Sequence, residues 1–199
     1  MAYEGLSRDD LDNVRALNRV WLELEGAAEL RLSATRMERL AATPFLLFSF
    51  CEHDDAKWSR LLGEGQQQDL LEHDEALSAE LSALQTAGLG FLWELVRRNP
   101  YVARIISGAS VRWCEQIAAA TLVRVLDCAR FKMIEPRFEQ EISLQRRLLA
   151  RGSALEREMR VFTQMGALQS MLTSAQTDTR LPAAACRMPQ TARKVADDV

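Results

Sequence analysis

Apolar side chains recur every three or four residues along most of this chain, a spacing that predicts a series of amphipathic helices. The first predicted helix runs from Ser7 to about Gly26. Ser7 has a hydroxyl that can cap a helix, and Asp10 follows within the first turn, where acidic groups suit the positive helix end. A second helix is predicted over residues 27–42, ending before the Thr43-Pro44 pair.

The wholly apolar run Pro44–Phe50 fits either a buried strand or a buried helical turn. No partner strand is evident elsewhere in the sequence. We therefore predict a short helix with Pro44 at its first position, where the missing N–H costs nothing. A further short helix is predicted to begin near Asp54 and to end near Leu62.

The second part of the chain predicts longer helices. The ranges are 66–86, 87–98, a helix that Pro100 opens and that continues to about residue 126, and 139–173. Ser107-Gly108 and Gly152-Ser153 are the candidate bends. The sequence GEGQQQ (63–68) is the candidate joint between a helical head, residues 1–63, and a helical body, residues 66–173. Residues 174–199 are polar and irregular, and we predict a flexible tail.

Composition agrees with an all-α protein of one domain, or of one domain with a small head. Apolar residues make up 48% of the 199 residues, and glycine (9) and proline (5) are sparse. The net charge of −3 gives no overall basic excess. The four cysteines have no paired spacing, which argues against disulfides or a zinc framework and favours the cytoplasm. The N-terminus does not resemble a signal peptide, and no long uncharged apolar run predicts a membrane span.

Few residues are candidates for catalysis. The triplet Glu52-His53-Asp54 recurs as Glu72-His73-Asp74 and contains both histidines. Neither triplet has the spacing of a known metal-ligand motif, so solvated charges are the favoured interpretation. Cys51 and His53 are two residues apart and would not face each other on a helix, so the cysteines are interpreted as buried apolar residues. We predict no enzyme, no metal and no cofactor.

Aromatic residues of the body suggest either core packing or an apolar pocket between helices. The candidate pocket residues are Phe91, Trp93, Tyr101, Trp113 and Phe162. Charge is divided unevenly along the chain. Residues 89–160 contain thirteen basic and eight acidic side chains, whereas residues 1–65 contain eight basic and twelve acidic ones. The basic excess fits a solvated helix face or a surface for an acidic partner.

One stretch, LGFLWELVRRNPYVARIISG, resembles the start of the ligand-binding body in the tetracycline-repressor (TetR) family. The resemblance lies in Arg98-Asn99-Pro100 and in the apolar-Arg-apolar pattern around Arg104. In the head, Leu47-Phe48, Trp58 and Leu61-Leu62 align with the family's conserved apolar positions. The resemblance implies a small three-helix head and a larger body that dimerises through residues 139–173.

The resemblance also implies a function, that of a transcriptional regulator whose body binds a hydrophobic small molecule. The basic residues of the head then become candidate DNA-phosphate contacts, namely Arg31, Arg36, Arg39 and Lys57. An acidic, apolar head favours the alternative, a TetR-like fold without DNA binding that acts as a protein-interaction or lipid- or small-molecule-binding module. A third hypothesis is an enzyme that uses the His53 and His73 clusters.

Overall fold

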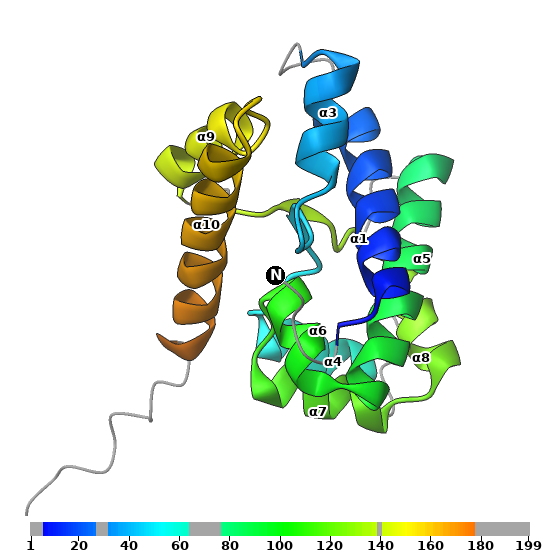
Figure 1. The fold of residues 1–199 in the computed structure, drawn as a ribbon. Coiled ribbons are helices and arrows are strands. Elements are labelled where there is room, and N and C mark those ends of the chain that lie inside the picture. Colours follow the sequence, from blue (N-terminus) through cyan, green and yellow to red (C-terminus); the bar gives the residue numbers. More distant parts are fainter. Residues whose placement is uncertain (1–5, 27–31, 64–76, 139–140, 178–199) are drawn as a thin grey trace, which may run out of the picture.

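The computed structural model describes residues 6–26, 32–63, 77–138 and 141–177, and these residues are mostly helical (Figure 1). Two short strands, β1 (Phe48–Ser49) and β2 (Glu135–Pro136), pair antiparallel with Phe48 opposite Pro136. The helical elements are α1 (Arg8–Trp21), the π-helical turn η1 (Leu22–Gly26), α3 (Ala34–Ala41), α4 (Asp55–Leu62), α5 (Ala79–Arg98), α6 (Pro100–Ser107), α7 (Val111–Ala119), α8 (Leu122–Asp127), the 3-10 turn η2 (Cys128–Arg130), α9 (Ile142–Arg151) and α10 (Arg157–Thr177). Among the described residues, no helix has the length and apolar character that crossing a membrane requires.

Several predicted helix starts are confirmed. Ser7 caps α1 in a reciprocal arrangement: the backbone N–H of Asp10 donates to Ser7 Oγ, and the backbone N–H of Ser7 donates to the Asp10 carboxylate, each at 3.0 Å. Asp54 caps α4 by accepting from the N–H of Lys57 at 2.8 Å. Pro100 is the first residue of α6, as predicted.

The predicted helix over Pro44–Phe50 is wrong. This segment is an irregular and extended chain that includes β1, and Phe45 to Phe50 are buried. The buried amide of Asn18 replaces helical hydrogen bonds. Its Nδ2 lies 2.9 Å from the carbonyl oxygen of Phe45, and its Oδ1 accepts from the N–H of Leu47 at 2.8 Å. The partner strand that the sequence did not reveal is β2.

The long helix predicted from Pro100 to about residue 126 is also wrong, because it is divided into α6, α7 and α8. Gly108 ends α6 in the left-handed region, with a φ of 70°. Ser110 and Thr121 then cap α7 and α8, so that each helix begins on a side chain that accepts a backbone N–H. The first of these breaks lies at Ser107-Gly108, one of the two candidate bends. Sequence periodicity does not reveal the second break, between α7 and α8, because apolar residues continue through it.

The helix predicted over 139–173 is an antiparallel pair instead. Helices α9 and α10 lie side by side, and the chain turns at Gly152, the predicted bend (Figure 1). The N-terminal part of the helix predicted over 66–86 falls outside the described residues. Helix α5 begins on the Ser78 cap and runs unbroken to Arg98. Similarly, α3 begins only after Ser33, and residues 178–199 of the predicted tail lie outside the described part.

Buried residues of the predicted head and body form one hydrophobic core. Trp58 of α4 meets Trp113 of α7 edge to face, with ring centroids 5.4 Å apart. The ring of Phe50 packs so closely on α5 that a Cβ at Gly88 would lie 2.5 Å from it. The 44–50 segment therefore packs directly against α5, in the middle of the molecule.

Arg137 joins this core to the start of the α9–α10 pair. Its buried guanidinium donates to the carbonyl oxygens of Phe48 and Ser107, and it lies 3.2 Å from the buried Glu52 carboxylate. In Figure 1 the α9–α10 pair lies on one side of β1 and β2, and α1 and α5 lie on the other. Helices α1 and α10 therefore face each other, one from each side.

Candidate functional site

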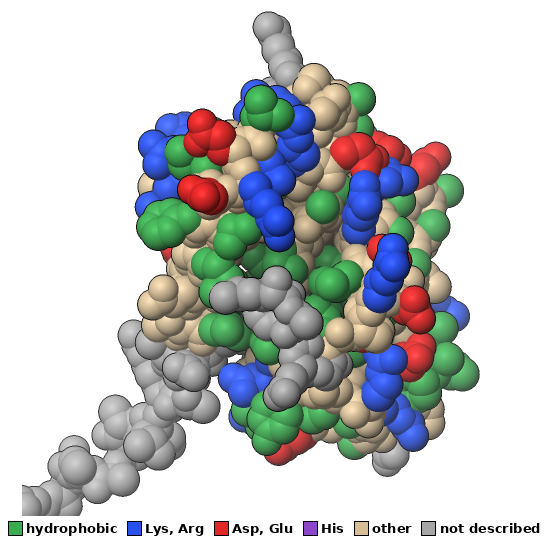
Figure 2. Space-filling model, viewed as in Figure 1, with side chains coloured by type: hydrophobic (Ala, Val, Ile, Leu, Met, Phe, Trp, Pro, Cys, Tyr) green, Lys and Arg blue, Asp and Glu red, His purple; other side chains and the backbone are tan. Residues whose placement is uncertain are grey.

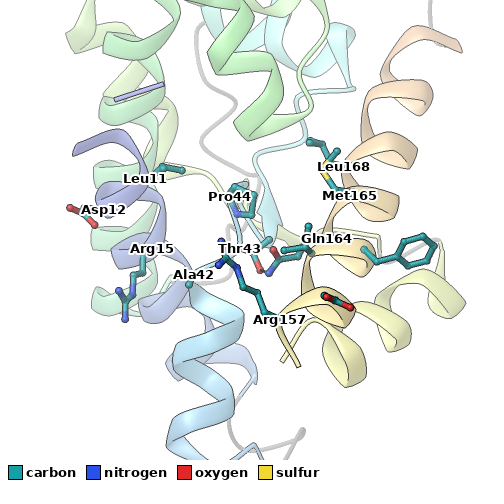
Figure 3. A pocket seen from close by; sticks show the side chains of 13 residues that line it. Leu11, Asp12, Arg15, Ala42, Thr43, Pro44, Arg157, Gln164, Met165 and Leu168 are labelled. Atoms are coloured by element: carbon teal, nitrogen blue, oxygen red, sulfur yellow. Dashed lines mark hydrogen bonds between the residues drawn. The ribbon is translucent and has the colours of Figure 1, made fainter. Parts of the chain in front are cut away.

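An apolar groove of about 1000 Å³ lies between α1, residues 42–44 and α10, and it is open to solvent (Figure 3). Its volume is at the upper end of the range typical of small-molecule sites, about 300–1,000 Å³. Helix α1 contributes one wall, α10 contributes the opposite wall, and the 42–44 segment lies between them. Figure 2 shows hydrophobic side chains gathered on this face between α10 and α1.

The apolar wall that α10 contributes to the groove follows from the helical spacing of its side chains. Val161, Met165 and Leu168 are separated by four and three residues, so they lie on one helix face. Ala167 and Met171, on a different face, are buried in the core. Val161 of α10 is 44% exposed, and Leu11 of α1, on the opposite wall, is 36% exposed. Helix α10 thus has two apolar faces, one that anchors the helix and one that lines the groove.

Polar groups at the floor of the groove are paired with each other. Thr43 is buried, and its hydroxyl donates to the carbonyl oxygen of Leu40 at 2.6 Å. The same hydroxyl accepts from Gln164 Nε2 at 3.3 Å, which joins α10 to the floor. Because this hydroxyl is already both a donor and an acceptor, the interior of the groove offers mainly apolar contact to a ligand.

Charged residues line the groove near α3. Arg15 is held by Glu38, with the Arg15 Nη2 and Glu38 Oε2 atoms 2.9 Å apart. In Figure 3 the Arg157 side chain extends from α10 toward Ala42 and Thr43, whereas Asp12 points away from the groove. Among the described residues, Arg157 has neither a hydrogen-bond nor an ion-pair partner.

The five predicted pocket residues do not come together. Trp113 is fully buried in the core, and Tyr101 is 75% exposed on α6. Trp93 is half-buried on α5, where its indole N–H donates to the carbonyl oxygen of Ala120 at 2.9 Å and its ring lies under the Arg97 guanidinium. Phe91 packs partly buried against the core. Phe162 alone among the five lines the groove.

The four predicted DNA contacts are dispersed as well. Arg31 lies outside the described residues. Arg36 of α3 donates to Ser153 Oγ and to the carbonyl oxygen of Ala150, and Arg39 is half-buried on the same helix. Lys57 belongs to α4, with its Nζ 3.5 Å from Cys51 Sγ. Helices α3 and α4 lie toward opposite ends of the molecule in Figure 1.

The interpretation of the cysteines as buried apolar residues is confirmed for Cys51, Cys114 and Cys128. Burial raises the pKa of the Cys51 thiol to about 12, and it raises the pKa of the Cys114 and Cys128 thiols to about 11. Cys186 lies outside the described residues. These thiols are therefore protonated at neutral pH, which disfavours nucleophilic chemistry.

The Glu52-His53-Asp54 triplet separates into different environments. Glu52 is buried against Arg137, His53 is exposed, and Asp54 caps α4. His73 lies outside the described residues. Within the described part of the chain, no group of three His, Cys, Asp or Glu residues is arranged to hold a metal ion.

Sequence reasoning missed the contribution of α1 to the groove. It placed Leu11 within the first predicted helix without a partner, and it assigned the Pro44–Phe50 segment to a helix. The signal on α10 was present, since apolar residues occupy more than one face there. The position of the opposite wall depended on a fold that periodicity does not specify.

Comparison with known proteins identifies no relative of this chain. No protein-family model matches the sequence, and neither the curated proteins nor the solved structures contain a match. The fold and the groove together define a class of protein, a mostly helical protein with an open apolar groove.

Proposed function

We propose that this protein is a binding module that takes an apolar ligand into the groove between α1 and α10. The observation that carries the proposal is the groove itself, which combines apolar walls with a floor whose Thr43 hydroxyl is already hydrogen-bonded. Such sites bind mainly by removing apolar surface from water. This function corresponds to the small-molecule-binding alternative that the acidic, apolar head favoured.

The free energy of moving methylene groups from water into the groove determines how affinity should depend on ligand size. Each buried methylene contributes about 0.8 kcal/mol, which is about a fourfold gain in affinity. Within a series of straight-chain alcohols, affinity should therefore rise about fourfold per methylene until the groove is filled. A ligand that adsorbs nonspecifically would show the same trend, so a groove variant is needed to locate the site.

Val161→Asp locates the binding site, with Val123→Asp as its matched control. Both valines are exposed, at 44% and 70%, but Val161 lines the groove and Val123 is on α8. Titration calorimetry with octanol and decanol should show binding to the wild type and to Val123→Asp, and at least tenfold weaker binding to Val161→Asp. The charged group in an apolar wall causes the loss. Equal affinities of both variants, or no binding to the wild type, would overturn the proposal.

We further propose that the chain forms a homodimer through the α9–α10 pair. Support comes from apolar side chains that the two helices and the turn between them leave in water. Leu155 of the turn is 78% exposed, Phe162 of α10 is 81% exposed and Ile142 of α9 is 57% exposed. Exposed apolar patches of this kind mark contact surfaces. Sedimentation equilibrium should give a dimer that Leu155→Asp dissociates and Val123→Asp does not. A wild-type monomer at all accessible concentrations argues against the dimer.

Regulation of transcription remains a prediction of the TetR resemblance. DNA binding needs a helix that enters the major groove and basic residues that reach phosphates. The 44–50 segment is buried and extended, and Arg36 is occupied by hydrogen bonds to residues 150 and 153. Fluorescence anisotropy with random duplex DNA at low and high salt tests the prediction. Salt-dependent binding that Arg39→Ala weakens would support it, and no binding at low salt would remove it.

A further inference from the structure

The groove between α1 and α10 is not uniform along its length. Leu11, Met165 and Leu168 line it at one end, and the charged residues Arg15 and Arg157 lie toward the end nearer α3 (Figure 3). Figure 2 shows Lys and Arg side chains over α3, adjacent to the hydrophobic surface. An apolar interior with cationic groups at one end is the arrangement that suits an amphiphile, not a hydrocarbon.

Not all charged residues that line the groove act on its interior equally. Asp12 points away from the groove, and the Arg15 guanidinium is already paired with Glu38. Glu158 follows Arg157 directly on α10, and adjacent residues on a helix do not face the same direction. Arg157 extends toward the floor at Ala42 and Thr43, so it is the cation nearest to the path of a bound ligand.

The beginning of α10 adds to the positive character of this end. Helix α10 starts at Arg157 and runs for 21 residues, so its N-terminus lies at the same end of the groove. Helix N-termini carry a partial positive charge that favours anions. The guanidinium of Arg157 supplies the full charge and the paired donors that a carboxylate accepts.

From this arrangement we infer that the ligand is a single-chain carboxylate, of the fatty-acid type, bound as a free molecule with its carboxylate at Arg157 and its chain toward Leu11 and Leu168. The inference rests on the proposed function and specifies the ligand class for the same groove. Because Arg157 is exposed to solvent, its contribution is of the size of a surface ion pair, about 0.2–1 kcal/mol. The expected advantage of the carboxylate is therefore about 1.4- to fivefold in affinity, and salt should reduce it.

Paired ligands of equal chain length test this inference. Decanoate and decanol, both below micelle-forming concentration, are titrated into the full chain, into Arg157→Gln and into the control Arg146→Gln. Arg146 is exposed on α9 and does not line the groove. We expect the wild type and Arg146→Gln to bind decanoate about 1.4- to fivefold more tightly than decanol. Arg157→Gln should bind the two ligands equally, and Arg157→Lys should retain most of the preference.

The possible outcomes separate the two proposals. If neither ligand binds the wild type, the proposed function fails and the ligand class fails with it. If decanol binds as tightly as decanoate, the groove binds apolar molecules but the inference of a carboxylate is wrong. A preference for decanoate that survives in Arg157→Gln also overturns the inference, since the anion then lies elsewhere. Thermal unfolding of each variant verifies that an exposed arginine was replaced without loss of the fold.

Discussion

Two apolar regions of this molecule differ in what covers them. The run Pro44–Phe50 lies in the centre of the core, with Phe45 and Phe48 fully buried. The α9–α10 pair is also rich in apolar residues, yet Leu155 and Phe162 remain mostly exposed. Hydrophobicity alone therefore does not decide burial here. The backbone of the buried segment is hydrogen-bonded by polar side chains from other parts of the chain. The exposed pair instead borders the groove and leaves an apolar surface available for a partner.

Removing Arg137 should produce the largest effect on the buried region. Arg137→Met leaves the Glu52 carboxylate, 3.2 Å away in the native protein, buried without a cation, and it leaves the Phe48 and Ser107 carbonyl oxygens without their donor. Breaking a buried ion pair from one side typically costs about 3–5 kcal/mol. Urea denaturation should show this loss in the free energy of unfolding.

The double variant Arg137→Met with Glu52→Leu is the control for this measurement. It removes the uncompensated charge, so it should recover part of the lost stability. The proposed difference between the two regions would be contradicted if Arg137→Met unfolded at the same urea concentration as the wild type. In that case the buried segment would not depend on its ion pair.

Asn18→Ala should have the next largest effect. The Asn18 amide donates to the carbonyl oxygen of Phe45 and accepts from the N–H of Leu47, and both groups are buried. Each buried group left unsatisfied costs at least about 1 kcal/mol, so with two such groups the expected loss is at least about 2 kcal/mol. Asn13→Ala, on the exposed face of the same helix, is the matched control and should change stability by less than about 0.5 kcal/mol. Equal effects of the two variants would show that the buried amide is not what fixes the segment.

These polar contacts explain which parts of the fold were predictable from the sequence. Helix starts at Ser7, Asp54 and Pro100 were predictable because a capping group or a proline acts within one turn. The extended 44–50 segment was not, because Asn18 and Arg137 satisfy its backbone from 29 and 89 residues away. Contacts at such separations leave no periodic signal in the chain.

The groove was predictable in part. The sequence predicted a helix over residues 139–173, which contains Met165 and Leu168, and it gave Phe162 as a candidate pocket residue. It did not pair them with Leu11, because the meeting of α1 and α10 depends on how the chain turns at residues 108 and 152. The aromatic residues that the sequence emphasised, such as Trp113, fill the core instead.

Asp10, a buried carboxyl group at the start of α1, gives a pH-dependent test of stability. Burial raises the pKa of its carboxyl group, but hydrogen bonds from Ser7 and the nearby Arg98 outweigh that effect, and the net pKa is below the usual value of 3.8. A carboxyl pKa that is lowered in the folded state stabilises the protein above the unfolded-state pKa. That stabilisation is lost as pH falls through the folded-state pKa.

Asp10→Asn should therefore cost about 1 kcal/mol at pH 7, since it weakens the hydrogen bond from the Ser7 backbone N–H to the Asp10 side chain and removes the ion pair with Arg98. The difference in unfolding free energy between Asp10→Asn and the wild type should shrink as the pH is lowered from about 5 toward 2. Chemical denaturation at a series of pH values measures it. A difference that stayed constant with pH would mean that the negative charge of Asp10 does not contribute.

The smallest expected effect is that of Arg36→Ala, which tests whether the α9–α10 pair opens independently of the core. Arg36 attaches α3 to the α9–α10 turn through Ser153 Oγ at 3.1 Å and the carbonyl oxygen of Ala150 at 3.3 Å. Exposed hydrogen bonds contribute about 0.5–1 kcal/mol, so Arg36→Ala should accelerate amide exchange in α9 and α10 by about two- to fivefold. Amides of α5 should exchange at the wild-type rate, and Arg39→Ala should change neither region. If exchange in α5 and α10 accelerated equally, the two regions would open as one unit, and the groove between them would be a fixed feature of the core.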